Sequence, residues 1–574
     1  MSAFHAPLLA RRGATDAVAA RRFLAPSAAD LHDPFQLCGR EAAATRLVEA
    51  GRRGERVAIV GDYDVDGITG TAILVAVLGR AGIATEPILP NRLIDGYGFQ
   101  VGHVDRARAA GCSLIVTVDC GSTASAAVAR AREAGVDVII TDHHLASHPL
   151  PADTLQINPQ QPACTYPFRE LTGAGLAFKL AQAVAIRSER PLPIEPLLRI
   201  ACLGTIADVA PLVGENRTIA ALGLKALRQT RSEGLRALIR VAGVVPPFRA
   251  TDVGYRLGPR INAAGRLHRP EEALELLLTR DPARAAALAT ELDERNRERQ
   301  TEELNVVEEA RRRVLERGVL PPIVIEWSPE WHRGVVGIAA ARIAREFNRP
   351  TVLISIDGAS GVGSGRSIRG IHLHQFLSTF ETEMVRFGGH AQAIGLEVAA
   401  DSLPELRARL EASAAAAWPP ELLERRYEYE IEVAPRDVDE TLLDRLLQLE
   451  PFGAGNPSPL LRVGPLTIEG PPRIFGKGHL RAQARGDDGG LVRLLLWCRG
   501  DADAAPTLPE RLEVLGQLEW DSFLQAPVLE VAASRPYRAA TDEVVRTVGD
   551  EALFANEARA VTADPAPATA ATES

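Results

Sequence analysis

Between about residues 55 and 235, short runs of β-branched residues alternate with helix-like segments. Three of these runs, Arg56–Val60, Ser113–Val118 and Val136–Thr141, are each followed by a polar or glycine-bearing loop and then by a helical pattern. This alternation predicts a mostly parallel sheet with helices on both of its faces. In sheets of this kind, ligand-binding groups gather at the carboxyl ends of the strands.

A long segment without glycine or proline runs from Asp281-Pro282 to Gly318. Aspartate before the helix, proline at its first position and glycine beyond its end are typical boundaries of a single helix. Residues 292–303 are almost all polar, which predicts that much of this helix faces solvent. At 1.5 Å per residue the helix spans about 50 Å. It can bridge two domains across a cleft or pack along one domain, and the sequence leaves both interpretations open.

The pattern changes again in the C-terminal half. A second α/β unit is expected at about 320–415, beginning with the strand Pro322–Glu326. From about residue 425, short alternating segments separated by turns predict a small β-barrel. Its expected strands are Tyr427–Ile431, Leu466–Glu469, His479–Ala484, Leu491–Trp497, Arg511–Leu515 and Val528–Ala532. The expected regions are an N-terminal arm (1–45), a parallel-sheet domain (46–280), the connecting long helix (281–318), a second α/β domain (319–420), the barrel (421–540) and an acidic, partly disordered tail (541–574).

The bulk properties limit the class of protein. A chain of 574 residues is too long for one core and suggests three or four domains. The six cysteines are scattered without paired spacing, which argues against structural zinc and suits a reducing cytoplasm. We find no apolar leader and no long apolar run, so we expect neither secretion nor a membrane span. The net charge of −9 argues against simple phosphate binding, although an acidic metal site and an acidic tail can conceal a basic groove.

The most informative candidate site follows the first strand. After Val57–Val60 the chain places Asp62, Asp64 and Asp66 at alternate positions before Gly67. In extended geometry alternate side chains point the same way, so three carboxylates would leave the strand as one cluster. Such a cluster is unfavourable without a cation, and carboxylate oxygens are the ligands that magnesium and manganese prefer. The alternative is a solvated acidic turn.

Three later segments end in similar side chains. Asp119 follows a buried strand, Asp142, His143 and His144 follow another, and Asp208 lies beside a helix-like run. Singly, each has an ordinary explanation, such as a helix cap or a hydrogen-bonded loop. Together they supply enough ligands for two divalent ions that share a bridging carboxylate. Two such ions about 3.5–4 Å apart can activate a water and stabilise both oxygens of an in-line phosphoryl displacement.

These segments resemble the ordered motifs of the DHH phosphoesterase superfamily, named after the triplet Asp142-His143-His144. Within it the chain resembles the RecJ family of single-strand-specific 5′→3′ exonucleases over about residues 40–535. Many other members of the superfamily have a histidine a few residues before these aspartates. This chain has Val60 there instead, as RecJ proteins do. The other matching segments are Asn91–Gly98, Gly258–Arg266, Gly363–Ser367, Gly388–His390 and Pro451–Asn456.

The resemblance implies an α/β fold: a parallel-sheet DHH domain and a DHH-associated domain joined by the long helix, followed by an OB-like barrel. It also implies the roles of individual residues. Two divalent cations, Mn²⁺ or Mg²⁺, would be held by Asp64, Asp66, Asp119, His143 and Asp208, with Asp119 as the bridge and Asp62 in or beside the ligand set. His144 would face the scissile phosphate. The phosphate groups of the strand would be bound by Arg92, Ser364, Arg366, Gly388, Gly389 and His390.

Elementary chemistry supports some of these roles. Arg366 follows Gly363-Ser364-Gly365, and a glycine-rich turn exposes backbone N–H groups to an anion beside the guanidinium. The segment Gly388–His390 reads equally as an ordinary turn with an exposed histidine. Three residues of the Gly258–Arg266 segment can contact phosphates or cap a helix, and we leave them out of the site: Arg260, Asn262 and Arg266.

The function implied is a two-metal exonuclease that degrades single-stranded DNA from its 5′ end to mononucleotides in recombination and repair. The barrel would bind the single strand. The implied setting is a cytoplasmic monomer, not bound to a membrane, with a single-strand-binding protein and a RecQ-like helicase as partners. The first rival is a phosphoesterase that acts on very short oligonucleotides, cyclic dinucleotides or pyrophosphate, and the added barrel argues against it. The second is a non-catalytic scaffold, which predicts gaps among the acidic residues.

Overall fold

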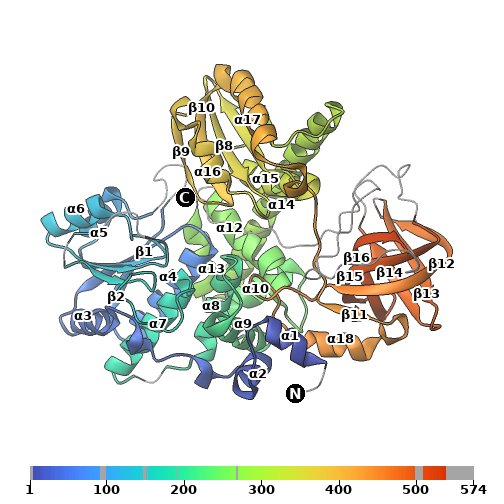
Figure 1. Ribbon diagram of the computed structural model, residues 1–574. Coiled ribbons are helices and arrows are strands. Elements are labelled where there is room, and N and C mark those ends of the chain that lie inside the picture. The colour runs from blue at the N-terminus through green and yellow to red at the C-terminus, as the bar shows by residue number, and fades with distance from the viewer. Residues whose placement is uncertain are drawn as a thin grey trace. The chain divides into compact units, whose positions relative to one another are not determined.

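The computed structural model describes residues 4–90, 98–145, 150–151, 153–190, 192–266, 269–476, 478–497 and 508–537 (Figure 1). These residues form two compact units. The first unit consists of residues 14–303 with the short segment 451–456, and the second of 4–13, 304–450 and 457–537. Among the described helices, none combines the length and apolar character needed to cross a bilayer.

The first unit contains a five-stranded parallel sheet built from β1 (Arg56–Gly61), β2 (Ala84–Ile88), β3 (Cys112–Val118), β4 (Asp137–Thr141) and β5 (Leu155–Ile157). The strand order is β2-β1-β3-β4-β5, and every pairing is parallel. The predicted parallel sheet is confirmed. Pairing continues past the strand ends, since Asp62 N donates to Val118 O (3.1 Å) and Asp119 N to Thr141 O (3.0 Å). The residues that follow β1, β3 and β4 therefore emerge side by side.

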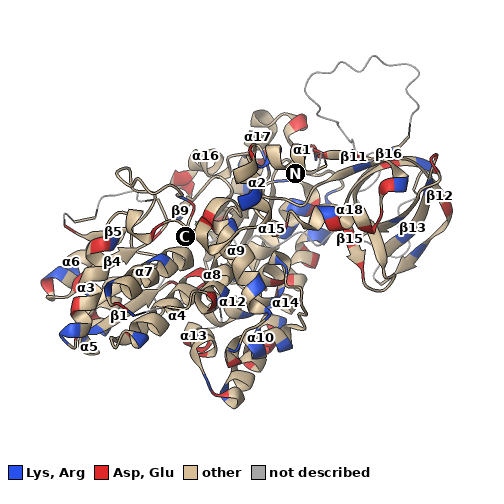
Figure 2. Ribbon diagram, turned by 90° about the horizontal axis from the view of Figure 1, so that it is seen from below, with Lys and Arg blue, Asp and Glu red and all other residues tan. Residues whose placement is uncertain are grey.

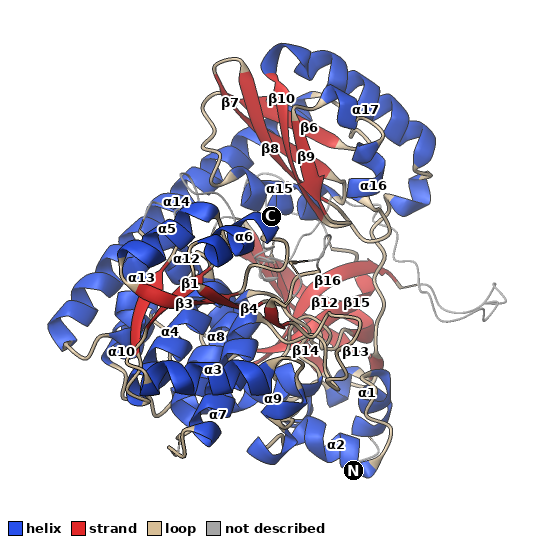
Figure 3. Ribbon diagram, turned by 90° about the vertical axis from the view of Figure 1, so that its left-hand side faces the viewer, coloured by secondary structure: helices blue, strands red, loops and turns tan. Residues whose placement is uncertain are grey.

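Helices cover both faces of this sheet (Figure 3). The helices of the first unit are α2 (Ala17–Leu24), α3 (Arg40–Arg52), α4 (Val65–Arg80), α5 (Val101–Ala109), α6 (Ser125–Glu133), α7 (Gly173–Arg187), α8 (Glu195–Ala207), α9 (Gly214–Leu227), α10 (Glu233–Ala242), α11 (Ala250–Asp252), α12 (Gly258–Arg266) and α13 (Pro270–Leu278). Val57 and Ile59 of β1 belong to the larger core with α3, α4 and α7, whereas Ala58 and Val60 pack with α5 and α6. Burial on both faces explains why these strands read as continuous apolar runs.

The predicted long helix is α14 (Pro282–Glu316). Its boundaries are confirmed, because Asp281 caps the first turn and Gly318, just beyond the end, has a φ of 70°. Leu288 of its first part belongs to the core of the first unit, and Val307 of its later part belongs to a core of the second unit. The helix therefore joins the two units rather than packing along one of them.

The second unit begins with a mixed five-stranded sheet built from β6 (Val324–Ser328), β7 (Thr351–Asp357), β8 (Ser360–Arg366), β9 (Arg386–Gly389) and β10 (Ala393–Ala399). Its order is β6-β7-β8-β10-β9, with β6 and β7 parallel and the other pairings antiparallel. Its helices are α15 (Val336–Phe347), α16 (Leu373–Ser378) and α17 (Leu403–Ala417). The α15 side chains share one core with α14, and those of α16 and α17 lie in another. The expected second α/β unit is thus present.

The predicted barrel is also confirmed. Its strands are β11 (Ile431–Val433), β12 (Leu461–Phe475), β13 (His479–Gly486), β14 (Leu491–Leu496), β15 (Arg511–Asp521) and β16 (Ala526–Pro536), and the second unit also holds α1 (His5–Arg11) and α18 (Glu440–Leu447). Because β12 pairs with both β13 and β15, five strands close on themselves, and β11 adds to β12. The predicted strand Tyr427–Ile431 is wrong except at its last residue. Tyr427 and Tyr429 pack against the barrel as an extended segment, which gives the same alternation without strand pairing.

Candidate active site

Asp64 and Asp66 stand at the start of α4. The helix begins at Val65 because Asp64 caps it: Asp64 Oδ1 accepts the N–H groups of Asp66 (2.9 Å) and Gly67 (3.0 Å). The extended geometry expected through Asp66 is therefore wrong, since the chain turns into a helix after Asp64. The same Asp64 side chain thus caps α4 and lies among the clustered carboxylates.

Asp66 is buried and held by the amino end of α7. Its Oδ2 accepts the N–H of Gly173 (2.5 Å), and its Oδ1 accepts the N–H of Ala174 (2.9 Å). A helix amino end favours a negative charge at this point. Two glycines make the close approach possible. A Cβ on Gly173 would lie 2.4 Å from Asp119 Cβ, and one on Gly204 would lie 2.5 Å from Asp66 Oδ1.

Asp119 follows β3 and has no exposed surface. Its φ of 63° lies in the left-handed region, which is strained for a residue other than glycine and is frequent at functional sites. Among the described residues, neither carboxylate oxygen has a hydrogen-bond partner. A buried, unpartnered carboxylate is strongly unfavourable. A divalent cation fits this position, because hard oxygen ligands would then be satisfied.

Asp142 and His144 form a tightly bonded pair after β4. Asp142 Oδ1 accepts the N–H groups of His143 (2.8 Å) and His144 (3.1 Å) and lies 2.7 Å from His144 Nδ1. Asp142 Oδ2 accepts the N–H of Ser122 (2.8 Å). The carboxylate therefore fixes the His144 ring through Nδ1, which leaves Nε2 as the nitrogen that points away from Asp142.

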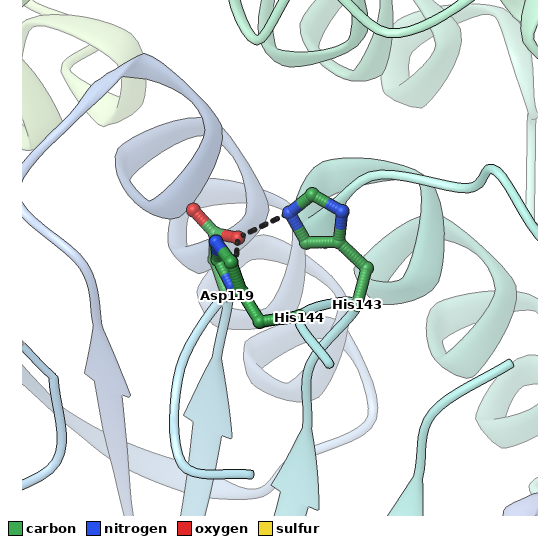
Figure 4. A group of neighbouring side chains, drawn as sticks. All are labelled: Asp119, His143 and His144. Carbon is green, nitrogen blue, oxygen red and sulfur yellow. Dashed lines mark ion pairs between the residues drawn. The ribbon is translucent and has the colours of Figure 1, made fainter. Parts of the chain in front are cut away.

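His143 lies at the centre of the carboxylates. Its Nε2 is 3.0 Å from Asp119 Oδ1 and 3.9 Å from the Oδ2 atoms of both Asp66 and Asp208. Figure 4 shows His143 and His144 turned toward the Asp119 carboxylate from the end of the neighbouring strand. His143 Nε2 is buried and has no hydrogen-bond partner among the described residues. This is the arrangement expected of a histidine whose Nε2 binds a metal ion.

Asp208 reaches the cluster from a helix rather than from a strand end. It follows α8, and the next residue, Val209, has a φ of 57°, which is strained for a β-branched side chain. The segment Pro451–Asn456 packs on the same loop, since Leu212 N donates to Ala454 O (2.7 Å). The strained turn after Asp208 is therefore supported by a distant part of the sequence.

The acidic and histidine side chains form three groups, two of which share no residue. In each group the ligand atoms lie within 4.8 Å of one another, and the groups are Asp62, Asp64 and Asp119; Asp66, His143 and Asp208; and Asp119, His143 and His144. The first two groups share no residue, whereas Asp119 and His143, 3.0 Å apart, link them. The donor set thus suits divalent cations at these positions.

The pKa directions reflect this crowding of like charges. Burial, and then the charge of Asp64, raise the pKa of Asp66 to about 7. Burial and the neighbouring carboxylates raise the pKa values of Asp119 and Asp208 well above the usual range. Burial and the charge of His144 lower the pKa of His143 to about 3, which favours the neutral form that binds metals. Burial and repulsion both disfavour the charged carboxylates, and bound cations would offset both effects.

The Asp142–His144 pair shows the opposite pattern. Burial alone would raise the pKa of Asp142, but the hydrogen bond and charge of His144 lower it to about 2. Burial opposes the charging of His144, but the hydrogen bond and charge of Asp142 raise its pKa to about 9. The pair therefore holds a carboxylate and an imidazolium together.

The remaining expected site residues lie in the second unit. Ser364 and Arg366 are buried on β8, and Arg366 Nη1 donates to Ser364 Oγ (2.8 Å) and to Gly365 O (2.9 Å). Gly388 and Gly389 belong to β9, and the N–H of the exposed His390 donates to Ala393 O (2.8 Å) in the turn to β10. The glycine-rich turn expected at Gly363–Gly365 is wrong, because these residues lie within β8 and pair with both β7 and β10. The structure brings Ser364 and Arg366 together on this strand and places Gly388–His390 at a hairpin. Arg92 lies outside the described residues.

Two residues that the sequence analysis left out of the site, Asn262 and Arg260, make contacts that support the fold. Three other residues support the site and were not predicted to do so. Asn262 Oδ1 accepts the N–H of Val65 (2.9 Å) between the two aspartates of α4, and Arg260 pairs with Asp293 (2.8 Å) of α14. The residues missed are Asp142 as the partner of His144, and Ser122 and Asn158 behind it. Asn158 follows the three-residue strand β5, which is too short to be recognised from the sequence.

Three family models match successive segments of the chain. The DHH family, N-terminal domain, matches residues 56–205, which contain Asp62, Asp119 and His143. The DHHA1 domain matches residues 320–416, and the RecJ OB domain matches residues 429–533. The fold and the acidic cluster thus define a DHH-type protein with an OB barrel.

Curated relatives and solved structures narrow this class. The chain is 36% identical to the single-stranded-DNA-specific exonuclease RecJ of Escherichia coli over 84% of its own length and 87% of that protein. It is 36% identical to the Bacillus subtilis protein of that name over 90% of its length, and spans 66% of that relative. The Thermus thermophilus RecJ structure in complex with Mn²⁺ has a TM-score of 0.78 and 34% identity, and the match covers 93% of this chain and 76% of that one. The chain belongs to the RecJ family of single-stranded-DNA-specific exonucleases.

Proposed function

We propose that the protein is a two-metal exonuclease that degrades single-stranded DNA in the 5′→3′ direction and releases mononucleotides. The observation that carries the proposal is the buried cluster around Asp119. Among the described residues, neither the Asp119 carboxylate oxygens nor Nε2 of the neighbouring His143 has a hydrogen-bond partner. RecJ structures contain Mn²⁺ and Mg²⁺. Either ion suits the ligand set of this chain, which is rich in carboxylates.

The metal-binding roles follow from the two groups of side chains. Asp64, Asp66, Asp119, His143 and Asp208 would hold the two cations, with Asp119 as the bridge. Asp62, which lies with Asp64 and Asp119, would complete the set. Cations bound there supply an activated water and stabilise negative charge on the scissile phosphate. No nucleophile from the protein is required.

His144 would act on the same phosphate. Its Nδ1 is bonded to Asp142 Oδ1, and Nε2 would be the nitrogen that donates to a phosphate oxygen. A donor held in place before the reaction stabilises charge that develops during cleavage. His144 would thus complement the metal ligands without replacing any of them.

Arg92, Ser364 and Arg366 would bind the 5′-terminal or adjacent phosphate. The segment Gly388–His390 would bind the scissile phosphate. The bond from Arg366 Nη1 to Ser364 Oγ fixes the guanidinium plane and supports a role in holding one phosphate in a defined orientation. Fixing the terminal phosphate would set the direction of degradation.

The barrel offers a surface suited to a single strand. Phe475 and His479 flank the turn between β12 and β13, with ring centroids 5.4 Å apart, and Trp497 lies 4.8 Å from His479. The Arg481 guanidinium lies 4.3 Å from the Phe475 centroid and 5.1 Å from that of Phe523, which is 79% exposed between β15 and β16. Such aromatic and arginine groups bind bases by stacking, and OB-folds use these two loops for oligonucleotides.

The net charge does not oppose this proposal. Figure 2 shows basic and acidic positions interspersed along the ribbon. Local arginine and aromatic groups, rather than the total charge of −9, would then provide binding. The described cysteines are free, which agrees with a cytoplasmic location. We propose a monomer that serves recombination and repair with a single-strand-binding protein and a RecQ-like helicase.

The test is digestion of a long 5′-phosphorylated, 3′-labelled single strand with Mn²⁺, Mg²⁺ or chelator. We expect metal-dependent shortening from the 5′ end, little action on duplex DNA, and loss of cleavage but retention of strand binding in Asp119→Ala. Asp137→Asn is the matched control, because Asp137 lies on the exposed amino end of the neighbouring strand. Faster cleavage of a dinucleotide, or full activity of Asp119→Ala, would contradict the proposal.

A further inference from the structure

Asn158, directly after β5, is a buried amide with all of its polar atoms engaged. It is 1% exposed, and its Nδ2 donates to Ser122 Oγ (2.9 Å) and to the carbonyl oxygen of His144 (2.9 Å). Its Oδ1 accepts the N–H of Gln160 (2.8 Å). A carbonyl oxygen can only accept a hydrogen bond and a backbone N–H can only donate one. These partners therefore fix which end of the Asn158 amide is Nδ2 and which is Oδ1.

Asn158 belongs to a buried network that joins the ends of three neighbouring strands. Ser122, in the loop after β3, donates its N–H to Asp142 Oδ2 after β4, and its Oγ accepts from Asn158 after β5. Ser122, Asp142 and Asn158 are all at most 2% exposed. Buried polar networks of this kind are rigid when every member is satisfied.

The network holds His144 at three atoms. Asp142 Oδ1 binds the backbone N–H and Nδ1 of His144, and Asn158 Nδ2 binds its carbonyl oxygen. The next residue, Leu145, is 72% exposed. The bond from Asn158 therefore fixes the backbone of His144 at the point where the chain leaves the protein interior.

We infer that Asn158 is a positioning residue that acts on catalysis through His144, an inference that rests on the proposed function. Without the amide, the His144 backbone can rotate about its bonds to Asp142, and the direction of Nε2 changes with it. The bonds of Asn158 go to Ser122, His144 and Gln160, not to the residues proposed to bind metal. Its loss should therefore slow the chemical step without weakening metal binding.

The first test compares Asn158→Ala with the wild-type protein on 5′-phosphorylated single strands. We expect kcat to fall about 10- to 100-fold, as is typical when a group that orients a catalytic histidine is removed. The KM for the strand and the Mn²⁺ affinity measured by calorimetry should not change. A weakened Mn²⁺ affinity, or an unchanged kcat, would contradict the inference.

A double-mutant cycle with His144→Ala separates positioning from general destabilisation. If Asn158 acts through His144, Asn158→Ala causes no further loss of kcat when His144 is already alanine. Fully additive losses would overturn the inference. A second readout is independent of activity. The His144 Nδ1–H resonance of ¹⁵N-labelled protein should broaden in Asn158→Ala, whereas an unchanged resonance would contradict the proposed effect on His144.

Two further variants guard against a simple folding defect. Gln156→Ala removes another donor to the same Ser122 Oγ (3.1 Å) without a bond to His144, and should keep wild-type activity. Asn158→Asp preserves the shape of the side chain but loses both donated hydrogen bonds, and should match Asn158→Ala. Equal losses in Gln156→Ala and Asn158→Ala would favour a purely structural role. If Asp119→Ala remained active, the proposed function would fail; if only Asn158→Ala were fully active, this inference alone would fail.

Discussion

Gly173→Ala places one methyl group at the start of α7, which contacts both Asp66 and Asp119. The new Cβ would lie 2.4 Å from Asp119 Cβ and 2.9 Å from Asp119 Oδ1. Since carbon atoms in contact rest about 3.5–4.0 Å apart, Asp119 must retreat by about 1 Å or α7 must move away. Moving α7 would disturb the bonds from Gly173 N and Ala174 N to Asp66. Either response shifts a proposed ligand, and metal–ligand distances tolerate only about 0.2 Å.

We therefore expect kcat/KM to fall about 100-fold, the loss typical of a 1 Å misplacement at a reaction centre. Overpacking should also lower the free energy of unfolding by about 1–3 kcal/mol. The assays are degradation of single-stranded DNA, Mn²⁺ titration by calorimetry, and urea unfolding. Gly102→Ala in the first turn of α5 is the matched control, because a Cβ there meets no atom within 4 Å. Activity and Mn²⁺ affinity of Gly173→Ala equal to those of Gly102→Ala would refute the reasoning.

Three other predictions concern the metals, the barrel and the phosphate-binding residues. Mn²⁺ at 100 times its Kd should raise the free energy of unfolding by about 2.7 kcal/mol for each cation bound, because the ions bind only the folded protein, where the buried carboxylates are gathered. Thermal melting would show this gain, and the same gain in Asp119→Ala would contradict the prediction. Phe523→Ala should weaken binding of single-stranded DNA by about 1–3 kcal/mol in fluorescence anisotropy. Because Phe523 is exposed, the melting temperature of the protein should not fall. Unchanged binding would show that Phe523 is not part of the strand-binding surface. Arg366→Lys keeps the positive charge but loses the forked N–H donors of the guanidinium. The KM should therefore rise more for 5′-phosphorylated than for 5′-hydroxyl strands. An equal rise for both would argue that Arg366 does not recognise the terminal phosphate.

Much of the fold could be predicted because local patterns agree with the tertiary structure. Strands β1, β3 and β4 are buried on both faces, so their apolar runs mark them clearly. The boundaries of α14 follow from Asp281 and Gly318, which act locally. The segment at Tyr427 was misassigned because packing against a barrel and pairing in a sheet give the same alternation of buried side chains.

The candidate site was predictable where it follows strand ends and not where it depends on contacts between distant segments. Asp119 and His143 come directly after strands, so the sequence places them at one edge of the sheet. Asp66 lies instead in a helix, and its orientation depends on N–H groups more than 100 residues away. Gly173 matters only because α7 contacts Asp119, and Asn158 only because three loops meet behind His144. No sequence periodicity reports contacts of this kind.

The most direct test of the two-metal centre is anomalous X-ray diffraction at the manganese edge from crystals soaked in Mn²⁺. We expect two peaks about 3.5–4 Å apart, as in two-metal phosphoryl-transfer sites. One peak should lie among Asp62, Asp64 and Asp119, and the other among Asp66, His143 and Asp208, with Asp119 contacting both. A single peak, or peaks away from these six side chains, would contradict the account.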